Sequence, residues 1–415
     1  EYSLVTFLKN QISKDSILGS FLFFLVLSSW YILRPVRNEM AVSNVDELPY
    51  LLAAGALLML LINPLYSWIA SRSNLIKIIT VCYSFLILNL LFFLFSWTVL
   101  DFSDSAWLGR IFYVWCNIYS FFIVSLFWVV IINTYRNSRK RSFYGVIMAG
   151  GSLGAVFGSE ISKRFSSSFD ELGIGLFSLS AALFLFFAML LAIYILSISK
   201  SDKASDINNA GGGSLDAISN SLKIKEIRNI AGYVWIWTAL MTIQWITAIN
   251  IVENWSQDSE QRLRFFATIE QVVSPLTLIV QLFLTNLIIK KVGIKKILII
   301  YGFLFCIAFL IYGLMPSIIA VAFVTIFLRI FEYGINKPTR EIIFSTFEKN
   351  DRYKSTVFID TFISRFGDLS GSAFITLGKF TNIAANSFPL IAIPIAGLLS
   401  ILGIQISKKI KFKDL

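Results

Sequence analysis

The sequence contains no histidine and few charged residues. Asp, Glu, Lys and Arg make up only 15% of its 415 residues, whereas soluble domains carry about 25%. Without histidine there is no imidazole for proton shuttling, for metal binding or for a Ser-His-Asp hydrolase. The three cysteines, Cys82, Cys116 and Cys306, lie singly in apolar runs, which argues against a disulfide framework and a zinc site. We therefore expect no cofactor, no metal site and no enzymatic activity.

The low charge leaves a very apolar chain. Hydrophobic residues make up 56% of it, and the aromatic residues include 39 Phe, 15 Tyr and 10 Trp. These side chains occur in long blocks, which excludes a soluble globular core and an intrinsically disordered chain. The pattern predicts a polytopic membrane protein whose surroundings are a lipid bilayer. The net charge of +11 is typical of basic cytoplasmic loops, so we expect no nucleic-acid partner.

The apolar blocks have the length of membrane-spanning helices. A bilayer core of about 30 Å needs about 20 apolar residues per helix, and continuous runs of that length do not fit the alternating strands of a membrane barrel. We predict an all-α membrane protein with twelve transmembrane helices. The predicted spans are 16–34, 48–70, 75–99, 108–134, 142–162, 172–199, 229–252, 262–289, 294–314, 316–336, 356–378 and 384–407.

The basic residues predict how the chain is oriented. With the N-terminus inside the cell, 26 Lys and Arg residues fall on the cytoplasmic side and 8 on the outer side. Lys and Arg are enriched in cytoplasmic loops, and a missed span would scramble every later loop. We therefore predict a protein of the cytoplasmic (inner) cell membrane with both termini in the cytoplasm.

A long loop divides the predicted spans into two sets of six. Residues 200–228 form a cytoplasmic linker that contains Gly211-Gly212-Gly213, a flexible composition, between an N-terminal half (1–199) and a C-terminal half (229–415). A basic turn follows the second span of each half. Two six-helix halves resemble the major facilitator architecture, in which the substrate cavity lies at the midplane between the halves. We expect the protein to be a monomer.

Several polar residues lie within the predicted spans, where a charge costs about 2.5–3.5 kcal/mol. Guanidinium groups match carboxylate and phosphate in bidentate fashion. The pattern thus favours a polar cavity that binds a small anionic solute, with arginines in contact with the anion and acidic residues orienting or counterbalancing them. The candidate substrate-binding residues are Arg34, Arg37, Arg329, Glu332, Asn336, Asp360, Arg365, Asp368, Glu270, Gln244 and Asn117.

Other interpretations of the same residues stay open. Arg329 and Glu332 are three residues apart, as are Arg365 and Asp368, so each pair could simply neutralise itself on one helix face. Arg34 and Arg37 lie near the end of the first span, where long side chains reach towards the headgroups. Glu270 or Asp360 could instead carry a proton. In the span 142–162, glycines recur at 150, 154 and 158, which predicts close helix packing.

Several stretches resemble one known family. They are Tyr31–Met40, Asp46–Leu51, Val124–Trp128, Ala149–Ala155, Glu332–Glu341, Asp351–Lys354, Phe358–Thr361 and Arg365–Asp368. Together they are similar to the nucleotide transporters (ATP/ADP antiporters, or translocases) of intracellular bacteria and plastids and to bacterial relatives of that family, usually placed in the major facilitator superfamily.

The resemblance implies roles for particular residues. It implies that Arg34 and Arg37 meet nucleotide phosphates and that Arg352 and Lys354 belong to a basic segment. The chain differs from the family at Asn38, at Cys116-Asn117 and at Thr356. We expect a secondary transporter that works by alternating access and exchanges organic phosphates or nucleotide-like anions. The alternative is a proton-coupled major facilitator transporter or exporter of another small molecule.

Overall fold

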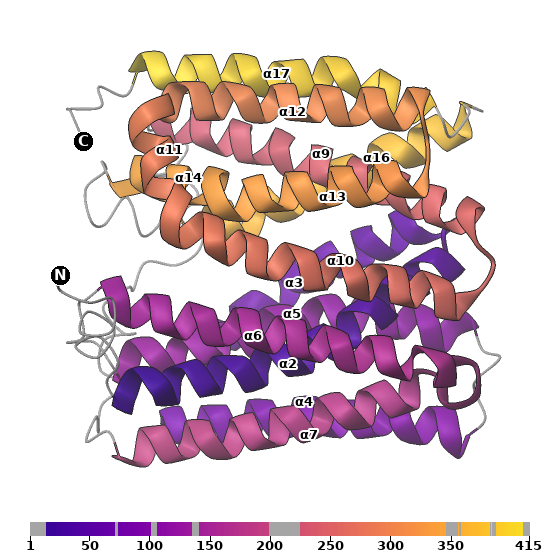
Figure 1. Ribbon diagram of the computed structural model, residues 1–415, viewed down its shortest axis with the longest axis vertical. Helices are drawn as coiled ribbons and strands as arrows, with labels where there is room; N and C mark the ends of the chain where they lie inside the picture. The colour runs from indigo at the N-terminus through magenta and orange to yellow at the C-terminus, as the bar shows by residue number, and fades with distance from the viewer. Residues whose placement is uncertain are drawn as a thin grey trace, which may run out of the picture. The chain divides into compact units, whose positions relative to one another are not determined.

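A computed structural model shows that the chain is helical throughout the residues it describes (Figure 1). These residues are 14–70, 74–100, 106–134, 141–198, 225–345, 356, 358–381, 383 and 387–409. Most of the predicted linker, together with Arg352 and Lys354, lies outside them. The first residues described after the linker, from Lys225, already belong to a helix.

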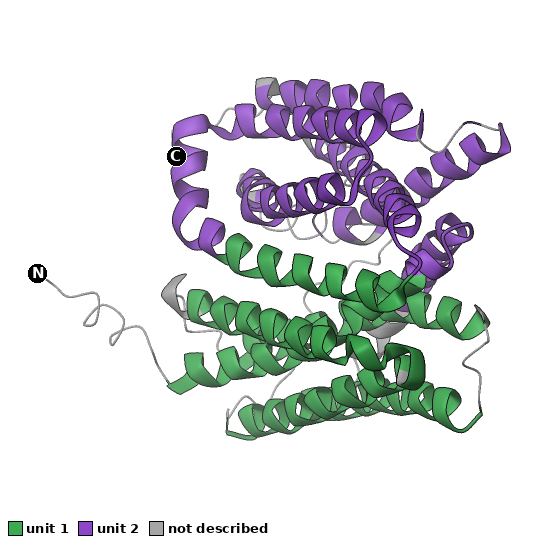
Figure 2. Ribbon diagram, turned by 45° about the vertical axis from the view of Figure 1, so that its right-hand side comes forward, with its two compact units in different colours: residues 1–40, 66–210, 258–278 green, residues 41–65, 211–257, 279–415 purple. Residues whose placement is uncertain are grey.

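Two compact units make up the structure (Figure 2). Unit 1 comprises residues 1–40, 66–210 and 258–278, and unit 2 comprises 41–65, 211–257 and 279–415. Each unit therefore takes in a segment from the other predicted half: 258–278 in unit 1 and 41–65 in unit 2. The division into halves at 1–199 and 229–415 remains a prediction.

Unit 1 is built from long apolar helices. Its elements are α2 (Lys14–Ser43, to residue 40), α4 (Leu75–Thr98), α5 (Ala106–Thr134), α6 (Arg141–Phe165), η2 (Ser166–Ser168), α7 (Phe169–Ile198) and α10 (Ser259–Ile279, to residue 278). Helices α4 and α7 pack side by side, as Figure 1 shows.

Unit 2 contains the remaining helices. They are α3 (Leu48–Ala70, to residue 65), α9 (Lys225–Trp255), η4 (Val280–Leu284), α11 (Thr285–Val292), α12 (Ile294–Leu314), α13 (Ile318–Phe331), η5 (Glu332–Asn336), α14 (Lys337–Ser345), η6 (Ile359–Ile363), α16 (Ser364–Phe380) and α17 (Phe388–Lys409). Helix α12 packs along α17, and α9 packs along α16 and α17.

Ten helices in the described part of the chain are long and apolar enough to cross a membrane. Within the predicted span 48–70, the residues whose side chains are described form a shorter apolar helix, Leu48–Ile62. The predicted span 356–378 corresponds to η6 and α16, and α16 has 17 residues and carries Arg365 and Asp368. The apolar helices establish a multi-pass membrane protein, and the count of twelve spans remains a prediction.

Two helices extend beyond their predicted ends. Helix α2 runs to Ser43 with Pro35 in its interior, and α13 continues through η5 and α14 to Ser345. The predicted ends at residues 34 and 336 were wrong because an apolar run stops at its first charges, whereas a helix continues where those charges find partners in the fold.

Three segments of unit 2 are π-helical: η4, η5 and η6. A π-helical turn leaves backbone carbonyls to be satisfied by other donors. The Gln281 amide donates to the carbonyl oxygen of Tyr333 at 3.0 Å, and the Thr285 hydroxyl donates to that of Gly334. Residues in η4 and directly after it thus satisfy carbonyls of η5. Because π-helical turns often accompany functional sites, η5 and η6 draw attention to Glu332, Asn336 and Asp360.

The glycines of α6 pack against α2, as predicted. A Cβ atom at Gly154 would overlap the backbone carbonyl of Phe24, and one at Gly150 would overlap the backbone of Ser20. The Ser28 hydroxyl crosses the contact and donates to the carbonyl oxygen of Gly154 at 3.2 Å. The stripe therefore lets the two backbones approach closely enough for hydrogen bonding between helices.

Gly154→Ala should destabilise the protein by about 1–3 kcal/mol, because the added methyl group overpacks the contact. The measurement is thermal unfolding of the purified protein in detergent. The control is Gly397→Ala in α17, where an added Cβ meets nothing within 4 Å, so that replacement should be neutral or mildly stabilising. Equal melting temperatures for the two variants would contradict the packing role of the stripe.

Candidate functional site

Arg37 lies in the interior of unit 1, on α2. One guanidinium nitrogen donates to the side-chain oxygen of Asn117 at 2.9 Å, and another donates to that of Asn38 at 2.8 Å. The guanidinium also lies 5.9 Å from the ring centroid of Trp30 and 5.5 Å from that of Tyr113. The rings and carboxamides hold the cation in a defined orientation without themselves bringing a negative charge.

Arg34 lies one turn before Arg37 on the same helix. Its Nε is 3.1 Å from a carboxylate oxygen of Glu270 on α10, and the side chains of Arg34 and Glu270 are 18% and 2% exposed. The guanidinium also donates to the Tyr31 hydroxyl at 3.3 Å. Glu270 belongs to the predicted second half of the chain but to unit 1 of the structure.

A second buried ion pair connects the same two helices. The Arg262 guanidinium on α10 binds both carboxylate oxygens of Glu39 on α2. Their side chains are 7% and 0% exposed. This pair was not predicted, because Arg262 is the first residue of the predicted span 262–289 and Glu39 lies beyond the predicted end of the first span.

Polar residues of unit 2 gather around η5. Asn336 is fully buried and its side-chain oxygen accepts a hydrogen bond from the Tyr233 hydroxyl at 3.1 Å. Glu332 forms an ion pair with Lys337 at 3.2 Å. Arg329, one turn before Glu332, is buried in α13.

Arg340 and Asp360 form the connection between η6 and α14. A guanidinium nitrogen of Arg340 lies 2.7 Å from a carboxylate oxygen of Asp360. The same guanidinium lies 5.9 Å from the ring centroid of Trp237 on α9. Arg340 falls between the predicted spans 316–336 and 356–378, where a loop was expected, but it is a buried helical residue. The four-residue spacing of Glu332, Asn336 and Arg340 was the signal that the helix continues.

The remaining predicted residues of unit 2 lie in two places. Arg365 pairs with Asp368 at 2.8 Å on one face of α16, and Asp368 also accepts a hydrogen bond from the Thr242 hydroxyl at 3.1 Å. Gln244 is buried, and its amide donates to the Tyr312 hydroxyl at 2.9 Å. Arg365 and Asp368 thus form the ion pair that was one of the interpretations left open by their spacing.

The structure brings the predicted residues together in separate groups. Arg34, Arg37, Asn117 and Glu270 form one polar cluster in unit 1, hereafter the α2 cluster. In unit 2, Arg340 binds Asp360 and lies one helical turn after Asn336. Arg365 binds Asp368, and Gln244 donates a hydrogen bond to Tyr312. The residues missed from the sequence are Glu39, Arg262, Tyr113, Lys337 and Arg340. Among the described residues there is no group of three or more Cys, Asp or Glu that could hold a metal ion.

The comparison with solved structures identifies the fold. A variant of the nucleoside transporter NupG superimposes with a TM-score of 0.70 at 11% identity, covering 95% of this chain and 100% of that one. A bacterial homologue of the human lysosomal transporter Spinster gives 0.60 at 13% identity, covering 95% and 99%. A POT family peptide transporter gives 0.68 at 11% identity, covering 97% and 98%. The chain has the fold of a major facilitator-type transporter.

Sequence comparison does not assign the chain to a protein family. No protein-family profile matches the chain, and no curated protein matches it in sequence. The match to the solved structures extends over almost the full length of each of them. The resemblance to major facilitator architecture is therefore confirmed at the level of the fold, and the resemblance to ATP/ADP antiporters remains a prediction.

Glu39→Gln should strongly destabilise the protein. Removing one partner of a buried ion pair leaves the other charge uncompensated, at a cost of about 3–5 kcal/mol. The double replacement of Glu39 by Leu and Arg262 by Met removes both charges and should recover most of the loss. Thermal unfolding of the purified variants measures both effects.

The matched control is Arg264→Gln on the same helix. Arg264 pairs with Glu260 at 3.1 Å, but the two side chains are 55% and 34% exposed, so the expected loss is at most about 1 kcal/mol. If Glu39→Gln and Arg264→Gln lowered the melting temperature equally, the buried ion pair would contribute no more to stability than the exposed one.

Proposed function

We propose that the protein is a secondary active transporter that works by alternating access and exchanges organic phosphates or nucleotide-like anions. The observation that carries this proposal is the α2 cluster. Two guanidinium groups, on Arg34 and Arg37, lie one turn apart on a helix long and apolar enough to span a membrane. Such charges are expensive in a membrane and are typically retained for a solute or ion pathway.

The geometry around Arg37 suits a phosphate group. Asn117 and Asn38 accept hydrogen bonds from the guanidinium through neutral side-chain oxygens, whereas a phosphate would offer charged oxygens to the same N–H groups. The rings of Trp30 and Tyr113 fix its direction. A phosphate bound here would accept charge-assisted hydrogen bonds, which are about twice as strong as neutral ones.

The ion pair between Arg34 and Glu270 gives a reason for exchange rather than net flux. In the empty protein, Glu270 on α10 neutralises Arg34 on α2 and ties the two helices together. An anion that binds Arg34 would compete with Glu270 and weaken the contact between α2 and α10, which would then depend on the ion pair between Glu39 and Arg262. A conformational change is promoted only by a ligand that interacts differently with the two states, and this competition supplies the difference. The empty protein would then change state slowly.

The rest of the proposal follows the sequence and the fold. Arg329 and Arg365 would offer further cationic contacts, and Glu332, Asp360 and Asp368 would orient or counterbalance them. The distribution of basic residues supports a cytoplasmic-membrane protein with both termini in the cytoplasm. We propose that the protein acts as a monomer with two six-helix halves. The solved nucleoside and peptide transporters of the same fold support a small polar solute as cargo.

Proton coupling is the second candidate function. It is favoured by the burial of Glu270, which is 1% exposed and pairs with Arg34. Protonation of this carboxylate would release Arg34 much as an anion would. Asp360 suits this role less well, since its side chain is 45% exposed and already pairs with Arg340.

Arg37→Gln should lower the exchange rate at least tenfold, because the main phosphate contact is lost. The assay loads liposomes containing the protein with unlabelled ADP and follows the uptake of labelled ATP. The control is Arg110→Gln, since Arg110 also lies over a tryptophan ring, that of Trp107, at 5.1 Å. The proposal fails if no nucleotide or organic phosphate exchanges, or if Arg37→Gln and Arg110→Gln behave alike.

Collapse of the proton gradient should leave exchange intact. Labelled ATP uptake into ADP-loaded liposomes is measured with and without a protonophore, and the initial rates should agree. Glu270→Gln should allow uptake into liposomes without internal nucleotide, because the empty protein loses its ion pair. Uptake that stops with the protonophore, and that Glu270→Gln abolishes, would establish proton coupling instead.

A further inference from the structure

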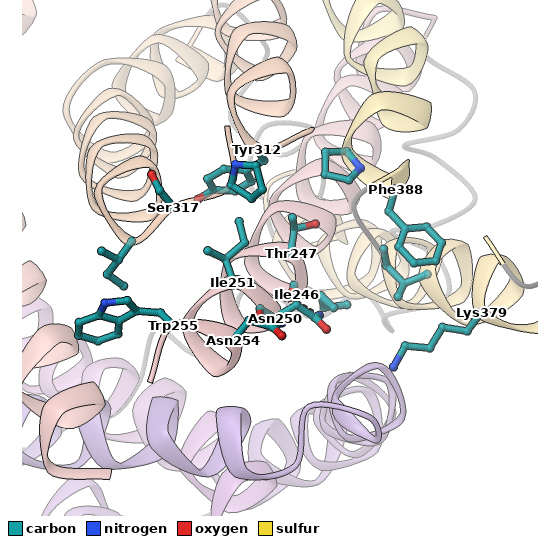
Figure 3. Close-up of a pocket in the computed structure, with 14 residues that line it drawn as sticks. Ile246, Thr247, Asn250, Ile251, Asn254, Trp255, Tyr312, Ser317, Lys379 and Phe388 are labelled. Atoms are coloured by element: carbon teal, nitrogen blue, oxygen red, sulfur yellow. Dashed lines mark hydrogen bonds between the residues drawn. The ribbon is translucent and has the colours of Figure 1, made fainter. Parts of the chain in front are cut away.

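Unit 2 contains a cavity of about 660 Å³ (Figure 3). It lies among the C-terminal half of α9, the turn between α12 and α13, the end of α16 and the start of α17. The side chains that matter for its chemistry are Asn250, Asn254, Trp255, Tyr312, Ser317 and Phe388. None of them belongs to the α2 cluster or to the ion pairs of unit 2.

The cavity lies at the ends of its helices that the basic residues assign to the outer side. Asn254 and Trp255 end α9, Ser317 precedes α13, and Phe388 begins α17. Each of these positions adjoins a loop that the distribution of Lys and Arg predicts to be outside the cell. A solute would therefore reach the cavity from the outer side.

The two asparagines present amide groups with unused hydrogen-bonding capacity. The Asn250 amide donates to the carbonyl oxygen of Ile246 at 2.8 Å, and the Asn254 amide donates to that of Asn250 at 2.7 Å. A carboxamide has two N–H donors and an oxygen that accepts. One N–H of each amide is bound to a backbone carbonyl, so each side chain still offers one N–H as a donor and its oxygen as an acceptor. This combination recognises a group that itself carries an acceptor beside a donor.

The cavity offers little for an ion to bind. Among the described residues that line it, the one charged residue is Lys379, whose ammonium group lies 3.4 Å from a carboxylate oxygen of Asp46 in the same unit. The other lining side chains are uncharged, and many are apolar. An anion here would have to compete with Asp46 for the ammonium group, whereas an uncharged solute needs no counter-charge. The rings of Trp255, Tyr312 and Phe388 instead suit a flat solute.

We propose that this cavity is a binding site for an uncharged, planar solute that carries an amide-like donor beside an acceptor, the class that includes aromatic amides. The site goes beyond the proposed anion exchange, because its chemistry selects against the charge that the α2 cluster selects for. Asn250 and Asn254 form the hydrogen bonds to the solute, and Trp255 provides a face for its ring.

The experiment uses two probes of the same shape, nicotinamide and nicotinate, with the full-length protein in detergent. Nicotinamide is an uncharged aromatic amide, whereas nicotinate carries a carboxylate on the same ring. Equilibrium binding of each labelled probe is measured, together with the shift in melting temperature. Nicotinamide should bind at least tenfold more tightly than nicotinate.

Asn250→Leu and Asn254→Leu should each weaken nicotinamide binding about tenfold or more. The matched control is Asn89→Leu in α4, because the Asn89 amide also donates to a helical carbonyl four residues earlier, that of Phe85, at 2.6 Å. Melting temperatures without a probe verify that the variants fold.

Binding that is equal for the two probes, or absent for nicotinamide, would overturn the proposal. So would binding that Asn250→Leu and Asn254→Leu leave unchanged, since the solute would then occupy another place. Both variants should retain nucleotide exchange, because neither residue belongs to the α2 cluster. A failure of the exchange proposal would appear in the liposome assay alone and would leave this result unaffected.

Discussion

The cost of a charge in apolar surroundings is the constraint on which the rest of the structure depends. A buried ion must be paired and hydrogen-bonded, or its desolvation outweighs what it contributes. The described side chains follow this rule: Glu39 binds Arg262, Glu270 binds Arg34 and Asp360 binds Arg340. The pairs of Glu39 and Glu270 connect helices that are far apart in the sequence, α2 and α10. The same electrostatic requirement therefore holds the bundle together and places cations where an anionic solute can compete for them.

Close helix packing and π-helical turns both help to position these charged residues. The stripe of α6 that includes Gly154 lets α2 approach until serine side chains reach backbone carbonyls across the contact. This packing holds a helix that carries Arg34 and Arg37. In unit 2, the π-helical turns η5 and η6 are local departures from α-helical geometry, and their carbonyls depend on donors such as Gln281. Such departures are tolerated where neighbouring side chains satisfy the backbone, and they are common where function requires them.

Prediction from the sequence succeeded wherever short-range patterns contain the information. Apolar run length located the helices and glycine spacing located a helix contact, while the three-residue spacing of Arg365 and Asp368 left open the ion pair that the structure shows. It failed at helix ends and at long-range partners. Arg340 was assigned to a loop because hydrophobicity does not report where a polar helix continues. No local pattern could pair Arg262 with Glu39, because only the packing of α10 against α2 brings them together.

The sequence alone determined the class of the protein, because a chain this apolar can exclude water from its side chains only within a bilayer, and its length and charge distribution predict many spans. It also indicated polar residues whose placement in a membrane span costs enough free energy to suggest a function. Only the tertiary structure decided which charges meet, since a carboxylate chooses its partner by distance and burial rather than by sequence separation. The tertiary structure also decided where a cavity forms, because an empty volume depends on how side chains from several helices fail to fill the space between them.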